Sequence, residues 1–184
     1  MSAVSQALKK HAPKQLNLGP RLYGNDRVKE DWEQEFLFKA VGKYADVVSY
    51  NYYHVWTPEK NHLTNWTQWS GKPFIISEWY VKGEDTSMEN KTGAGWVVKT
   101  QKDRGLFYQN YTLALLESQN CVGWHWFRYQ DNDTVDEGVD TRIADSDVNK
   151  GIVDGDYTPY VELLAAMREV NMQLFDLIDY FDGA

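Results

Sequence analysis

The sequence has a single cysteine, Cys121, so no disulfide can form within the chain. It also lacks any run of about 20 apolar residues, the length that a helix needs to cross a bilayer. Its first residues, MSAVSQALKKHAPKQL, do not contain the apolar centre of a signal peptide. We therefore expect no membrane contact, and these absences leave the compartment unknown.

Basic residues are fewer than acidic residues. The chain has 27 acidic residues against 19 Lys and Arg, a formal net charge of −8. This balance argues against nucleic acid, whose affinity for proteins comes mainly from phosphate neutralisation. It argues equally against anionic lipid surfaces. With 42% hydrophobic and 25% charged residues, the sequence reads as one globular domain over residues 1–184.

No motif indicates a cofactor. A glycine-rich phosphate loop follows none of the expected strands. Asp145, Asp147 and Asn149 alternate as calcium ligands do, but Gly151 comes one position late for an EF-hand and no Glu closes the loop. We assign no metal site.

Aromatic residues are abundant, at 15%, with 8 Trp and 12 Tyr. Their flat apolar faces with a polar edge suit sugar rings. A large aromatic core is the equally simple alternative.

Hydrophobic patterning predicts an alternation of helices and short strands. Strands are expected over 15–18, 46–53, 74–77 and 121–127; helices over 2–11, about 25–44, 103–118 and from Thr158-Pro159 onward. A short Trp-containing segment covers 59–69, a polar stretch about 82–102 and an acidic loop about 131–156. Such alternation implies an α/β fold with four parallel strands, in a barrel or an open sheet.

Chemically suggestive residues gather where these strands end: Arg21 and Tyr23, residues 51–54, Glu78 with Trp79, and residues 124–129. In TIM barrels the catalytic groups lie at strand ends, which favours the barrel. A complete barrel takes about 250 residues. Four strands therefore predict half a barrel.

Glu78 follows the wholly apolar strand FIIS. A carboxylate in that position is costly unless it is hydrogen-bonded or has a chemical task. The alternative is a Glu that has already turned into solvent.

The segment KPFIISEW, residues 72–79, resembles strand seven of the clan-A glycoside hydrolases, and VGWHWFRY, residues 122–129, resembles strand eight. Residues 76–133 and 149–160 look like bacterial β-agarases and related galactan hydrolases. The resemblance implies the C-terminal half of a TIM (β/α)8 barrel, strands five to eight, from a retaining enzyme that is endo-acting on a β-linked galactan polysaccharide. Full-length relatives are expected to be secreted or periplasmic.

The resemblance also implies roles for particular residues. Glu78 would be the nucleophile, next to Trp79, and either Tyr53 or Tyr52 would hydrogen-bond it; parity along the strand leaves that choice open. Trp126, or failing it Trp124, would lie beneath the sugar. His54, His125 and Asn51 would bind hydroxyls, although His125 is also an ordinary candidate for a packed histidine.

The family's acid/base ends strand four, and no residue of this sequence matches it. Glu30, Glu33 and Glu35 belong to an expected helix, and Glu84 and Glu89 to a loop. We therefore expect little activity from the chain alone, and a homodimer or a complementary N-terminal half-barrel as its partner. The alternatives are a non-catalytic carbohydrate-binding protein and an inactive fragment.

Overall fold

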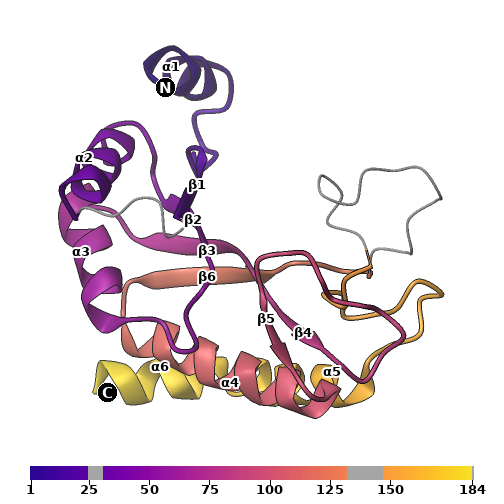
Figure 1. Cartoon of the computed structure of the whole chain (residues 1–184). Coiled ribbons are helices and arrows are strands. Elements are labelled where there is room, and N and C mark those ends of the chain that lie inside the picture. Colours follow the sequence, from indigo (N-terminus) through magenta and orange to yellow (C-terminus); the bar gives the residue numbers. More distant parts are fainter. Residues whose placement is uncertain (25–30, 132–146, 184) are drawn as a thin grey trace, which may run out of the picture.

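The structure, a computed structural model, describes residues 1–24, 31–131 and 147–183 (Figure 1). Its elements in order are α1 (Ser2–His11), β1 (Arg21–Gly24), α2 (Asp31–Gly42), β2 (Val48–Tyr52), α3 (Lys60–Ser70), β3 (Phe74–Trp79), β4 (Val81–Gly83), β5 (Trp96–Val98), α4 (Gln101–Glu117), β6 (Cys121–Trp126), α5 (Val161–Met172) and α6 (Leu174–Asp182). Within the described ranges, no helix is both long and apolar enough to span a membrane.

The main sheet has the order β1-β2-β3-β6, and every neighbouring pair is parallel. This confirms the prediction of an α/β fold in which parallel strands alternate with helices. In Figure 1, α2 and α3 lie beside β1 and β2, while α4, α5 and α6 gather along β6. The strands follow one another in space as they do along the chain.

The first predicted strand, residues 15–18, is wrong. The strand is β1, on the other side of the Gly19-Pro20 turn. The backbone carbonyl of Asn17 instead accepts hydrogen bonds from the backbone N–H groups of Asp46 and Val47, at 2.7 and 3.4 Å. The earlier segment is thereby a loop tied to the approach to β2. The expected start of the next helix, at residues 25 or 26, lies outside the described residues.

The polar stretch 82–102 is more ordered than expected. Val81–Gly83 and Trp96–Val98 pair in parallel as a separate small sheet. Strands of three residues are too short to display the alternation by which a strand is recognised. Helix α4 then starts with a capping box, in which Thr100 and Asp103 satisfy each other's backbone N–H groups.

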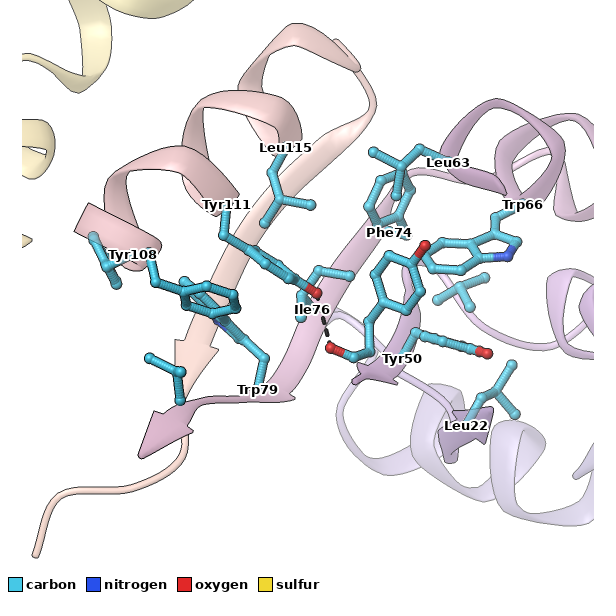
Figure 2. Packing of buried hydrophobic residues seen from close by; sticks show 14 of the residues in the cluster. Leu22, Tyr50, Leu63, Trp66, Phe74, Ile76, Trp79, Tyr108, Tyr111 and Leu115 are labelled. Carbon is cyan, nitrogen blue, oxygen red and sulfur yellow. Dashed lines mark hydrogen bonds between the residues drawn. The ribbon is translucent and has the colours of Figure 1, made fainter. Parts of the chain in front are cut away.

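The core beneath the sheet is largely aromatic (Figure 2). On one side, Trp66 of α3 stacks on Phe38 of α2, with ring centroids 5.5 Å apart, and packs against Tyr50 at 4.3 Å. On the other side, Trp79 stacks on Tyr111 of α4 at 4.0 Å. Much of the aromatic content therefore forms the core, which was one of the two explanations of the composition.

The last helix begins later than predicted. Pro159 forms an antiparallel bridge with Val153, and the Thr158 N–H donates to Asp154, so the helix starts only at Val161. It also breaks at Gln173. The buried residues of α5 are Leu163, Met167 and Val170, and α6 has no buried residue.

Candidate active site

Strand register aligns three polar side chains across the sheet. Tyr23 of β1 pairs with Asn51 of β2, and Asn51 pairs with Glu78 of β3. All three lie near the carboxyl ends of their strands, the edge at which parallel α/β folds place their ligands.

The Glu78 carboxylate accepts three side-chain hydrogen bonds. Oε2 accepts from Arg21 Nη2 at 2.8 Å and from Asn51 Nδ2 at 2.9 Å, and Oε1 accepts from the Tyr53 hydroxyl at 2.7 Å. The Glu78 side chain is 19% exposed. A carboxylate with this many donors is held in one orientation.

The donors are themselves fixed. The Ser77 hydroxyl donates to Asn51 Oδ1 at 2.8 Å, which points the Asn51 amide nitrogen at Glu78. The same Arg21 Nη2 also donates to the Ser77 carbonyl at 2.8 Å. Glu78 is therefore held by a small network that spans β1, β2 and β3.

The structure settles which tyrosine faces the carboxylate. Tyr53 reaches Glu78, whereas the Tyr52 hydroxyl bonds His62 Nδ1 at 3.0 Å on the helix-covered side. Burial raises the pKa of Tyr52 above its ordinary value. Successive residues of a strand point to opposite faces, so only one of the two can reach Glu78.

The tryptophans of β6 point the other way. Trp124 Nε1 donates to the Tyr108 hydroxyl of α4 at 2.8 Å. The Trp126 ring lies 5.1 Å from the Trp79 ring, with the Arg104 guanidinium 5.5 Å from its centroid, and its Nε1 donates to the Lys150 carbonyl. Trp79 also packs on α4, against Tyr111. This geometry favours packing roles for Trp124, Trp126 and Trp79 over contact with a sugar.

The two histidines predicted to bind hydroxyls, His54 and His125, are exposed. His125 lies between Trp124 and Trp126 along β6, so its side chain leaves the opposite face of the sheet, the face of Glu78. His54 follows Tyr53 with a positive φ of 61°. Their positions are compatible with hydroxyl recognition and do not support the alternative of a packed His125.

Sequence reasoning missed Arg21 and Ser77 as parts of the site. In the sequence alone, Arg21 is only one of several residues near a strand end. Alternation places Arg21 on the face of Tyr23, since the two are separated by one residue, and this signal could have found it. No local pattern announces that Ser77 orients Asn51, because the pairing depends on the register between β2 and β3.

A buried polar cluster supports the loops next to the site. Asn149 Oδ1 accepts from the Gly83 N–H and from Gln101 Nε2, and Asn149 Nδ2 donates to Asp131. Arg104, fully buried, donates to the carbonyls of Val81 and Gly151. Burial lowers the pKa of Arg104 to about 10, against the influence of Asp131. These bonds join the segment after β3, the start of α4 and the segment after β6.

Two of the other carboxylates considered as acid/base are paired with lysines. Glu35 pairs with Lys39 along α2, and Glu89 pairs with Lys91. Glu84 is exposed beyond β4. The side chains of Glu30 and Glu33 lie outside what is described. In the described part of the chain, no group of three His, Cys, Asp or Glu side chains is arranged to hold a metal ion.

No protein-family model matches the chain. It is 30% identical over 181 residues to beta-agarase B and 28% identical over 184 residues to beta-agarase A, both of Vibrio sp. (strain JT0107). These matches cover 96% and 95% of this chain but only 17% of each relative. The chain thus corresponds to a minor part of those proteins.

Solved structures agree. BpGH50 superposes with a TM-score of 0.83 at 43% identity, over 98% of this chain and 36% of that one. The structure of an exo-beta-agarase gives 0.77 at 29% identity, over 96% and 22%. Both the fold and the sequence matches make the chain similar to glycoside hydrolases. Within them, the similarity is to beta-agarases, which confirms the resemblance drawn from the motifs.

Proposed function

We propose that this chain is the nucleophile-bearing C-terminal half of a (β/α)8 barrel, one domain of a retaining enzyme that hydrolyses a β-linked galactan. The observation that carries the proposal is the Glu78 carboxylate, held by Arg21, Asn51 and Tyr53 at the end of a parallel strand. Four parallel strands in sequential order, and agarase relatives of which the chain covers a minor part, support the half-barrel.

In this reaction Glu78 Oε1 attacks the anomeric carbon and forms a glycosyl ester, while the glycosidic oxygen leaves with the bonding electron pair and takes a proton from the acid/base. Water, deprotonated by the same group, then attacks the anomeric carbon and releases the Glu78 carboxylate. Oε2 is anchored by two N–H donors, so Oε1 is the oxygen better placed to attack. A retaining enzyme needs a second carboxyl group about 5–5.5 Å away as acid and then base. The partner half-barrel supplies that group, because Glu35 and Glu89 of this chain are paired with lysines away from Glu78.

The test is complementation. The chain is co-expressed with the four N-terminal β/α units of an agarase relative, and reducing ends released from agarose and porphyran are measured. Activity is expected from the mixture and not from either half, and Glu78→Gln in this chain should abolish it. Activity that survives Glu78→Gln places the nucleophile elsewhere and refutes the proposal.

Endo-action remains a prediction, and one related structure is of an exo-beta-agarase. Product lengths at early times decide between the two. An endo-acting enzyme releases a ladder of oligosaccharides, whereas an exo-acting enzyme releases one short product.

The second candidate is a carbohydrate-binding protein without catalysis. The pairing of Glu35 and Glu89 away from the site favours it, since neither is then at hand as an acid/base. It predicts that oligosaccharides bind to the chain, while the complemented mixture shows no turnover.

A further inference from the structure

Arg21 is the charged partner of Glu78. Its guanidinium Nη2 lies 2.8 Å from Glu78 Oε2 and donates in addition to the Ser77 carbonyl. The Arg21 side chain is 52% exposed, so the pair lies at the open surface of the site rather than in the core. Neither the motifs nor the similarity to agarases assigns this residue a role.

Three donors hold the carboxylate, but only one of them carries a charge. Asn51 and Tyr53 bind one oxygen each through neutral groups, and they suffice to orient Glu78. The positive charge of Arg21 adds a different effect. It stabilises negative charge on the adjacent carboxylate oxygen, so it opposes a step that removes this charge and assists a step that restores it.

The charge of Glu78 changes twice during the proposed reaction. In the first step an Oε1 electron pair forms a bond to the anomeric carbon, the leaving group departs with its electron pair, and Glu78 becomes a neutral ester. In the second step a nucleophile bonds to that carbon, the bond to Oε1 breaks, and its electron pair returns to the carboxylate. A cation beside Oε2 therefore disfavours the first step and favours the second.

We propose that Arg21 is a positioning residue that makes the Glu78 carboxylate a better leaving group, so that it accelerates breakdown of the glycosyl-enzyme. The inference rests on the proposed function, because it presupposes that Glu78 forms the ester. It assigns to Arg21 an effect on one half-reaction that a general structural role would not produce.

The test uses this chain assembled with the N-terminal half-barrel and the trapping reagent 2-deoxy-2-fluoro-β-D-galactosyl fluoride. Fluoride leaves without protonation, so no acid/base is needed for the first step. Azide then attacks the anomeric carbon without a general base, and the glycosyl azide and the free carboxylate are formed. Adduct formation and decay are followed by intact mass spectrometry, with peptide mapping to locate the sugar on Glu78.

Arg21→Met removes the positive charge. Arg21→Lys keeps the charge but replaces the planar guanidinium by an ammonium group. Arg168→Met, at an exposed position of α5, controls for the change in net charge. In Arg21→Met we expect adduct formation at least as fast as in wild type and decay about tenfold slower, a difference of about 1.4 kcal/mol. Arg21→Lys should restore most of the decay rate, and Arg168→Met should match wild type.

Decay in azide-free buffer should slow by the same factor as decay in azide, because the role concerns the departing carboxylate and not attraction of an incoming anion. Wild-type decay in Arg21→Met overturns the inference and leaves the proposed function intact. Equal slowing of formation and decay also overturns it, since that is the signature of a misplaced carboxylate. A wild-type assembly of the two halves that forms no adduct on Glu78 overturns the proposed function, and the inference with it.

Discussion

The Tyr53 hydroxyl donates a 2.7 Å hydrogen bond to Glu78 Oε1, across the gap between the end of β2 and β3. The Tyr53 ring is buried and packs edge-on against Tyr80 at 5.3 Å. The rigid Tyr53 phenol thus holds Glu78 Oε1, the oxygen that we expect to attack the sugar. The neighbouring Tyr52, chemically identical, is bonded on the opposite face, so the two residues form a natural pair of variants.

Tyr53→Phe should slow turnover of the complemented enzyme about ten- to a hundredfold and leave the fold intact. A hydrogen bond to a charged group contributes about 1.5–3 kcal/mol, and each 1.36 kcal/mol is tenfold in rate. Tyr52→Phe should instead lower the free energy of unfolding by about 0.5–1.5 kcal/mol with turnover unchanged. Kinetics and urea unfolding of both variants check the contrast; equal effects on rate would contradict it.

Glu78→Gln should remove turnover while oligosaccharide affinity stays close to that of wild type. Gln has nearly the same shape but cannot form the covalent glycosyl ester. Titration calorimetry with agaro-oligosaccharides measures the affinity, and reducing-end release by the complemented mixture measures the rate. Loss of binding along with turnover would point to collapse of the Arg21 and Asn51 contacts rather than to lost chemistry.

Trp126→Ala should destabilise the fold rather than weaken sugar binding. An exposed platform would predict a loss of about 1–3 kcal/mol in binding, but the ring packs against Trp79 and Arg104. Stability should therefore fall by about 3–5 kcal/mol, the usual cost of truncating a packed aromatic residue. His125→Ala, on the other face of β6, is the matched variant and should affect binding more than stability. A stable Trp126→Ala protein that has lost affinity for the sugar would instead support the predicted role of Trp126 beneath the sugar.

Local patterns are sufficient to predict parallel strands and Glu78 at a strand end, and the family resemblance adds a tyrosine beside it. They are not sufficient to choose between Tyr52 and Tyr53, or to show that Trp124 and Trp126 face α4. A one-residue shift in phase turns every side chain of a strand to the other face. A sequence motif gives the order of residues but does not say which of them face the helices. Packing of the strand against the helices decides that.

Two predictions of secondary structure, the strand over 15–18 and the start of the last helix, were wrong for a similar reason. The segment 15–18 alternates like a strand, yet Asn17 is recruited by the backbone at Asp46 and Val47. Thr158-Pro159 reads as a helix start, yet Asp154 and Val153 hold it in a turn and a bridge. In each case a contact to a distant or preceding segment outweighs the local signal, and such contacts have no local signature.

Stability should fall as the pH rises above about 9 to 10. Burial raises the pKa of Cys121 from 9.0 to about 11 and that of Tyr50 from 10.0 to about 12. The folded state holds these protons more tightly than the unfolded state, so stability present below the unfolded pKa is lost as pH climbs to the folded one. Tyr52, Tyr108 and Tyr111 shift in the same direction, and Arg104, whose pKa is lowered by burial, opposes them.

Urea unfolding at pH 8, 10 and 11 measures this loss. Tyr50→Phe is the control, since it removes one titrating group and no hydrogen bond to the Tyr50 hydroxyl is found among the described residues. The variant should match wild type at pH 8 and lose stability less steeply above pH 10, by up to about 1.4 kcal/mol per pH unit. Parallel curves for the two proteins would show that Tyr50 does not contribute.

The chain on its own should associate and should not cleave an unactivated polysaccharide. In the described sheet, β1 and β6 each have one neighbouring strand, and unpaired strand edges recruit other chains. Beside the β6 edge lies a hollow lined by Val122, Trp124, Leu174 and Ile178. Val122 is 62% exposed, and Phe175 of the adjoining α6 is 77% exposed. Apolar surface of this kind marks an interface or a site of aggregation.

Size-exclusion chromatography with light scattering, run beside a reducing-sugar assay, tests both parts of this prediction. We expect dimers or larger species for the chain alone, and a defined one-to-one complex once an N-terminal half-barrel is present. Val122→Lys places a charge on the β6 edge and should shift the chain towards monomer, whereas Phe36→Lys, at another exposed apolar position on α2, should not. The general acid that we expect the partner to supply typically contributes about 10²–10⁴-fold to the rate. A stable wild-type monomer that cleaves agarose would therefore require both a closed sheet and a second carboxylate in this chain, and would refute the half-barrel.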